Sequence, residues 1–188
     1  MNKFLFFILI ITAFASCDGR ERAYMTNEAI LKEDNLFKAF SEELHFIPER
    51  PVVIETDTIL STGFEIKINY HSTEHNPIII SKKNKSDSIT YSHYKNFEAN
   101  IDFSKNSSLI TAFVLNKTHF NRFESPAFWN NAIMQYVWIN HEASDENRVQ
   151  LHTAFKIPET EIYKDFILSI FADGTTEIKE YQMTPKTI

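Results

Sequence analysis

The sequence FEIKINYH at residues 64–71 decides the fold class of this chain. Phe64, Ile66, Ile68 and Tyr70 alternate in it with polar or charged residues. Successive side chains of a β-strand point to opposite faces of the sheet. The stretch therefore predicts a strand with one face in a hydrophobic core and the other face in water.

Similar strand patterns recur along the chain, with turns at a spacing of roughly ten residues. The 188 residues include 17 Phe and 7 Tyr but only 3 Gly, and aromatic residues favour strands. Residues 109–115 are apolar on both faces, which predicts a central strand. The whole pattern predicts a mainly β fold, either an antiparallel β-sandwich or an open barrel. The predicted strands are residues 52–56, 64–71, 77–81, 88–94, 97–104, 109–115, 132–141, 148–157, 166–170 and 176–181.

Two helical segments are predicted beside these strands. Apolar residues from Thr26 to Ile47 recur at near-helical spacing, which indicates an N-terminal helix. Its apolar stripe is large, so we expect it to pack on the domain, and a stalk that does not pack is the alternative. Ser125 followed by Pro126 is a typical helix start, because serine caps the first turn and proline fits its first position. A short helix should therefore follow over residues 127–131. The insert from Phe120 to Asn131 is expected to cover an edge or an open end of the β structure.

The N-terminal residues have the layout of a signal peptide. Lys3 supplies a positive charge, Phe4 to Ile11 form an unbroken apolar run, and small residues lead into Cys17. The run is shorter than the roughly 20 residues that span a membrane. A buried helix of the fold is the alternative interpretation. We expect residues 1–16 to be a signal peptide.

Cys17 is the only cysteine of the chain, so no intrachain disulfide can form. The residues before it, with Phe14 where leucine is more common, resemble the lipobox of bacterial lipoproteins. That resemblance implies cleavage before Cys17, a diacylglyceryl group on its thiol, and acylation of the new amino terminus, for example by palmitate. The membrane is then a partner through the N-terminal lipid. A plain secretory signal with a free cysteine is the alternative.

The residues after the signal peptide are predicted to form one domain on a short tether. Residues 17–25 are short and charged and form the tether, and residues 26–188 form a single β-rich domain with an N-terminal helix. The net charge is −6 at pH 7, with positive and negative residues interspersed. This charge argues against nucleic acid as a partner.

Two further stretches carry a family resemblance. They are TDTILSTGFEIKI at residues 56–68, and IPETE at residues 157–161 followed by an apolar strand and Asp173-Gly174. Through these stretches the chain resembles small lipoproteins of unknown function from Bacteroidota. The resemblance extends over most of the chain after Cys17. The resemblance implies the cell envelope and a β-rich domain. It implies no activity, because the shared motifs are turn and strand patterns.

His71 and His75 are candidate metal ligands, because a loop could bring them to one ion together with His93 or Glu74. Surface histidines without a metal are the alternative, and no His-Glu-x-x-His pattern is present. No cofactor is predicted, since the glycines are too few and wrongly spaced for a phosphate-binding loop. The sequence shows no recognisable catalytic motif.

Four aromatic residues are the best candidates for an interaction patch. Phe128 and Trp129 lie in the predicted short helix, and Tyr136 and Trp138 lie in the following strand. Aromatic faces can stack on sugars or fill a pocket of a protein partner. The alternative is that these side chains belong to the core.

Thr58 and Ser88 are candidate O-glycosylation sites. Each follows an aspartate and precedes an isoleucine. The two tripeptides resemble the Asp-Ser/Thr-apolar sequence that is glycosylated in envelope proteins of Bacteroidota. Modification requires an exposed hydroxyl, so both residues are expected in or near turns.

Together these features favour a lipid-anchored binding or assembly module of the bacterial cell envelope, with a protein or glycan partner and without catalysis. An envelope hydrolase with site residues from distant strands is one alternative, and an inhibitory or structural lipoprotein is another. The periplasmic side is favoured over the cell surface. The reason is that Arg20 and Arg22 interrupt the acidic run that marks surface export in lipoproteins of Bacteroidota.

Overall fold

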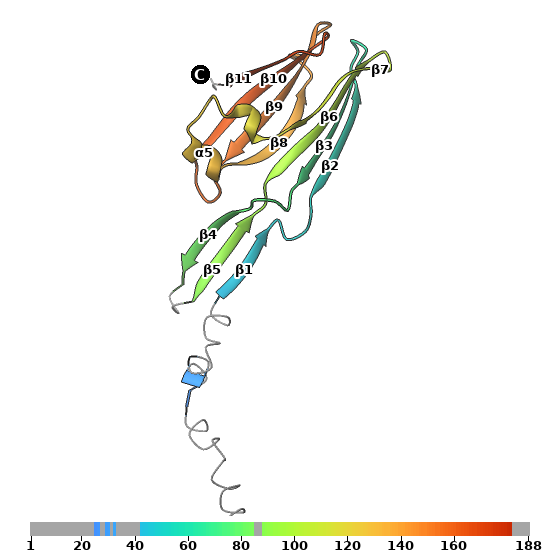
Figure 1. The fold of residues 1–188 in the computed structure, drawn as a ribbon. Helices are drawn as coiled ribbons and strands as arrows, with labels where there is room; N and C mark the ends of the chain where they lie inside the picture. The colour runs from blue at the N-terminus through green and yellow to red at the C-terminus, as the bar shows by residue number, and fades with distance from the viewer. Residues whose placement is uncertain (1–24, 27–28, 31, 33–41, 85–87, 182–188) are drawn as a thin grey trace, which may run out of the picture. The chain divides into compact units, whose positions relative to one another are not determined.

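A computed structural model describes residues 25–26, 29–30, 32, 42–84 and 88–181 (Figure 1). The predicted signal peptide and Cys17 lie outside these residues. The chain divides into two compact units, one comprising residues 1–43 and 82–90 and the other residues 44–81 and 91–188. Two four-stranded sheets, which carry the surfaces of interest, belong to the second unit.

The first of these sheets is antiparallel and has the strand order β2-β3-β6-β7. The stretch FEIKINYH lies in β3, as predicted, and its apolar side chains are buried. Opposite Ile66 and Ile68 lie the equally buried Phe103 and Ile101 of β6. The alternating polar residues therefore form the outer face. The bounds are β2 (Val53–Ile59), β3 (Phe64–Ser72), β6 (Phe97–Lys105) and β7 (Ser108–Leu115).

The second four-stranded sheet is also antiparallel and has the order β11-β10-β9-β8. Its inward residues include Phe155, Phe166 and Leu168, which share one hydrophobic core with the first sheet. The sheets keep free edges, and the described strands do not close a barrel. The prediction of a mainly β fold is confirmed. The bounds are β8 (Ile133–Asn140), β9 (Arg148–Lys156), β10 (Tyr163–Phe171) and β11 (Thr176–Glu180).

A third sheet has three strands in the order β1-β5-β4. The helix predicted from Thr26 to Ile47 is wrong at its C-terminal end, because the last residues form strand β1. Leu44 and Phe46 fit a two-residue period as well as a helical one, and pairing with β5 decides between them. Before β1, the described residues are helical only at 29–30 and 32. The bounds are β1 (Glu42–Ile47), β4 (Ile78–Lys83) and β5 (Ile89–Tyr94).

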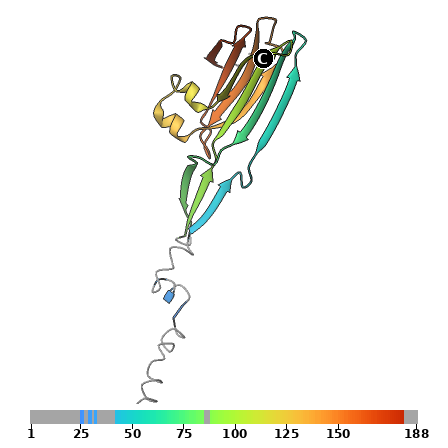
Figure 2. The same ribbon diagram turned by 45° about the vertical axis from the view of Figure 1, so that its right-hand side comes forward.

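The segment between β7 and β8 contains the predicted short helix, visible at one side of the sheets (Figure 2). Helix α5 (Pro126–Asn131) begins after Ser125, whose side chain accepts a hydrogen bond from the backbone N–H of Phe128. A preceding 3₁₀ helix, η1 (Lys117–Phe120), places Phe120 in the core. The predicted helical insert is confirmed.

Phe128 and Trp129 are core residues, which corrects their assignment to an interaction patch. They are only 7% and 4% exposed. The indole of Trp129 meets the ring of Phe155 edge-on, with centroids 5.0 Å apart, and the ring of Phe120 lies 6.1 Å away. The insert lays its apolar side on the core, so this pair contributes to stability and is not available to a partner.

Strand β7 lies at an edge of its sheet, whereas its apolar sequence predicted a central position. Leu109 is 64% exposed and Val114 is 42% exposed. Apolar residues on both faces are typical of strands that are covered on both faces. Strand order, however, depends on which strands the chain connects, and here β7 follows β6 as an outer strand.

Candidate functional site

The outer face of the β8–β11 sheet carries a group of aromatic side chains. Tyr136 and Trp138 are two residues apart on β8, so both side chains project from the face opposite the core. Trp138 lies opposite His152 of β9 in the strand register. The name aromatic face is used below for one set of residues: Tyr136, Trp138, His152, Tyr163 and Tyr181.

The Tyr136 and Trp138 rings form a stacked pair. Their centroids are 4.1 Å apart and their planes differ by 16°. Trp138 is 54% exposed although Tyr136 covers one side of its indole. The exposed area therefore lies on the other side and rim of the indole, where a flat ligand can stack.

His152 lies between this pair and Tyr181, which directly follows β11. Its ring meets that of Tyr181 edge-on, with centroids 5.1 Å apart. Its Nε2 atom is 3.1 Å from Nδ2 of Asn140, and with the amide as donor this ring nitrogen accepts the hydrogen bond. Polar groups thus stand directly beside the aromatic rings.

Tyr136 is held in place by Asp165 on β10. The Tyr136 hydroxyl donates a hydrogen bond of 3.0 Å to Oδ1 of Asp165. Burial, followed by the neighbouring carboxylate, raises the pKa of Tyr136 to about 12. The phenol is therefore neutral at physiological pH, and the bond fixes the ring on which Trp138 stacks.

A small hollow adjoins the aromatic face. Its volume is about 210 Å³, and Tyr163, Asp165 and Tyr181 contribute to its lining. Enclosed sites for drug-sized ligands measure about 300–1,000 Å³, so this hollow is smaller than such sites. The geometry suits a ligand that lies across the sheet and reaches the hollow with one group.

Lys164 sits at the rim of this hollow between two carboxylates. Its Nζ atom is 2.6 Å from Glu124 Oε1 and 2.9 Å from Glu180 Oε1. The hydrogen bond to Lys164 holds the pKa of Glu124 below its usual range, and the bonds to Glu124 and Glu180 raise the pKa of Lys164. The network links the insert, which contains Glu124, to β10 and β11.

Replacing Lys164 by methionine is expected to weaken the pH dependence of stability. A carboxylate with a lowered folded-state pKa stabilises the fold above its usual pKa, and this contribution is lost as pH falls. The raised pKa of Lys164 acts at the other end, since its contribution is lost as pH rises through that value. Wild type and Lys164→Met should therefore differ in Tm near neutral pH and converge in acid. An equal offset at every pH would argue against the network.

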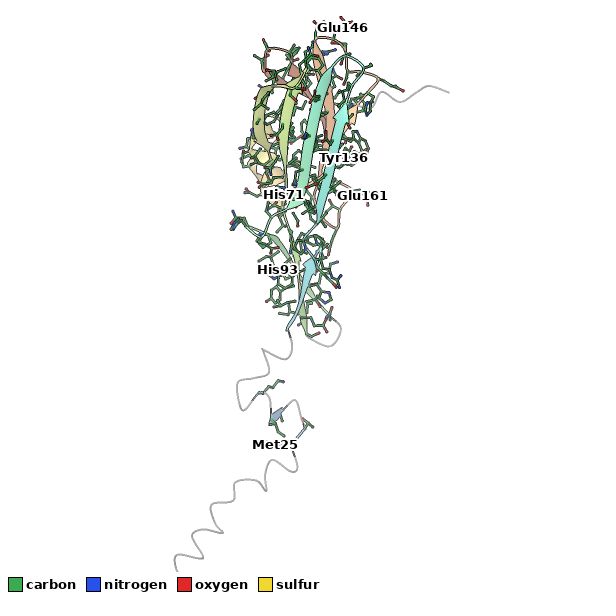
Figure 3. All side chains as sticks on the ribbon, turned by 90° about the vertical axis from the view of Figure 1, so that its right-hand side faces the viewer. Met25, His71, His93, Tyr136, Glu146 and Glu161 are labelled. Carbon is green, nitrogen blue, oxygen red and sulfur yellow. The ribbon has the colours of Figure 1, made fainter. Side chains whose placement is uncertain are left out.

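The candidate metal ligands do not converge. His71 Nε2 is 3.2 Å from Oε1 of Glu98 on the neighbouring strand, and His75 is exposed. His93 lies on β5, and Figure 3 shows it apart from His71. Within the described part of the chain, no three His, Cys, Asp or Glu side chains are placed to hold a metal ion.

The two candidate glycosylation residues lie in different settings. Thr58 is inside strand β2 and half-buried, opposite Ile66 of β3. Ser88 directly precedes β5, and its hydroxyl accepts a hydrogen bond of 3.1 Å from Nδ2 of Asn84. Ser88 thus lies just outside a strand and Thr58 inside one, and modification of either residue stays a prediction.

The middle of the outer face of the other four-stranded sheet is mostly polar. It has a hollow of about 330 Å³, lined among others by Glu55, Asp57 and Asp102. Lys67 Nζ lies 3.2 Å from Asp57 Oδ2 within this group. The lining contains no aromatic side chain, so stacking on a ligand is not possible there.

Sequence patterns missed His152, Tyr163, Asp165 and Tyr181 as members or supports of the aromatic face. Alternation along residues 148–157 places His152 among the outward side chains, which was the available signal. Recognising its position beside Trp138 requires the register of β8 and β9, and that register contains an irregularity between Met134 and Tyr136. Local patterns do not encode such a shift.

The chain was compared with protein-family models and with curated proteins. No protein-family model matches this chain, and no curated protein matches it significantly. Among the residues that the structure describes, no helix is long and apolar enough to cross a membrane. The functional interpretation therefore depends on the surface itself.

Proposed function

We propose that this protein is a lipid-anchored module of the bacterial cell envelope that binds glycans through the aromatic face of a β-sandwich. The stacked pair of Tyr136 and Trp138, exposed on the outside of a sheet, carries this proposal. A large aromatic side chain that remains exposed in a folded domain is unfavourable in water, and clusters of such side chains are typical of binding surfaces.

A glycan suits this surface better than an apolar ligand. A sugar ring has a flat face of C–H groups that can lie on an indole, and a rim of hydroxyl groups that need hydrogen-bond partners. The aromatic face offers both, since Asn140, His152 and Asp165 adjoin its rings. The hollow beside Asp165 is too small to enclose a drug-sized ligand but can take one group of an extended chain.

The envelope location is supported by the sequence. Lys3, the apolar run and Cys17 have the layout of a lipoprotein signal. Because the net charge is −6, a basic surface does not attach the protein to an anionic membrane. The N-terminal lipid therefore provides the attachment. We place the module on the periplasmic side, where envelope glycans are within reach of a short tether.

Replacing Trp138 by alanine is expected to weaken glycan binding by roughly thirtyfold, because truncation of a central aromatic residue commonly costs about 2 kcal/mol or more. Binding would be measured on an array of peptidoglycan fragments, O-polysaccharides and neutral oligosaccharides, with the best ligand then titrated by calorimetry.

Phe46→Ala is the matched control, since Phe46 is 47% exposed and lies on β1, away from the aromatic face in sequence and sheet. It should bind as the wild type does. If no glycan binds the wild type, or if the two variants lose affinity equally, the proposal is wrong.

A further inference from the structure

Strand β7 is an edge strand without charged residues, unlike most other edge strands of the described sheets. Strands at sheet edges expose unpaired backbone N–H and C=O groups, and proteins usually protect them with charges, with bulges or by shortness. Strand β2 carries Glu55 and Asp57, and β11 is short and charged. Among the described edge strands, only β7 and β8 have no charged residue.

Strand β8 is nevertheless a poor template for a further strand. Its pairing with β9 is irregular between Met134 and Tyr136. In addition, the backbone carbonyl of Met134 accepts a hydrogen bond of 2.9 Å from the Tyr70 hydroxyl of the other sheet. The irregularity and this bond interrupt the edge in the middle of the strand.

Strand β7 has a regular stretch that fits a further strand. Its irregularity is confined to the pairing with Phe103 and Ser104, and residues 111–115 pair regularly with β6. On the outer face of this stretch, Ala112 and Val114 are exposed. On the inner face, a groove of about 230 Å³ opens between β7 and β11. Its lining is mixed, with the apolar Phe113, Leu115, Leu168 and Ile178 beside Thr111, His119, Gly174 and Thr176.

We propose that β7 is the contact strand of a two-fold symmetric dimer, in which residues 111–115 pair antiparallel with the same residues of a second copy of this chain. Pairing about Phe113 sets Ala112 opposite Val114 of the other copy, which covers the exposed valine. It also brings a second Phe113 beside the apolar side chains that line part of the groove. Such an isologous contact satisfies both free edges at once.

The charge pattern favours a second copy over another protein. The chain has a net charge of −6, so two copies repel each other unless the contact itself is free of acidic residues. Strand β7 meets that condition, as the sequence SLITAFVL shows. The same antiparallel pairing of β2 about Thr56 would set Glu55 opposite Asp57 of the other copy and would be repulsive.

The test is native mass spectrometry of the full-length lipoprotein released from detergent micelles, over a wide range of protein concentration. Wild type should be a dimer. Val114→Lys should raise the dimer dissociation constant at least tenfold, because a charge on the paired edge must be desolvated. Ile59→Lys, at a residue that is 72% exposed on the β2 edge, is the matched control and should remain dimeric.

Ala112→Lys provides a second variant within the paired residues if Val114→Lys does not fold, since Ala112 is exposed and lies opposite Val114 of the other copy. Thermal unfolding shows which variants are folded. A wild type that is monomeric at all concentrations would overturn the proposal. So would a dimer that persists in both β7 variants, or one that is lost equally in Ile59→Lys.

Discussion

Phe120→Ala is expected to lower the free energy of unfolding by about 3–5 kcal/mol, the usual cost of removing a buried phenylalanine. Phe120 is fully buried, and its ring centroid lies 4.8 Å from that of Phe155 and 4.9 Å from that of Phe166. It comes from η1 and packs on two strands of the second sheet. Its removal leaves a cavity that these aromatic neighbours cannot close without moving.

The effect would be measured by urea denaturation followed by tryptophan fluorescence, with the slope of the transition checked for constancy. Phe46→Ala makes the same chemical change at a residue that is 47% exposed, and it should cost less than about 1 kcal/mol. Comparable losses in the two variants would show that the insert is not part of the core.

Cys17→Ala is expected to abolish both lipid attachment and membrane association. The thiol of Cys17 is the only cysteine thiol in the chain, so no other residue can receive the diacylglyceryl group. Several acyl chains hold a protein firmly on a bilayer, because each buried CH₂ contributes about 0.8 kcal/mol. Wild type should therefore be found in membranes, and the variant should not.

Wild type and variant would be expressed side by side and compared by intact mass and by membrane fractionation. The wild type should carry added lipid mass and begin at Cys17. If both proteins stayed soluble and were cleaved alike, the anchor would be disproved, and Cys17 would be a free thiol of a secreted protein.

Local sequence patterns predicted those elements whose conformation is decided locally. The alternation in residues 64–71 and 97–104 suffices for β3 and β6, because one face of each strand is buried and the other is wet. Ser125 and Pro126 suffice for α5, because capping depends on neighbouring residues only.

Features that depend on pairing partners could not be predicted in this way. Leu44 and Phe46 belong to a strand only because β5 lies beside them, and the edge position of β7 follows from the strand order. The sequence alone does not distinguish Trp129 from Trp138 as a surface residue. They differ because the insert turns Trp129 into the core, while the period of β8 turns Trp138 outward.

Glycan binding on the aromatic face can be tested most directly through the indole N–H signals of the protein in ¹H–¹⁵N correlation spectra. The chain has 2 Trp, so these signals report on the buried Trp129 and the exposed Trp138 alone. Addition of the strongest ligand from the array should shift the Trp138 signal progressively and leave the Trp129 signal in place. A glycan that binds without moving the Trp138 signal would contradict the proposed function of the aromatic face.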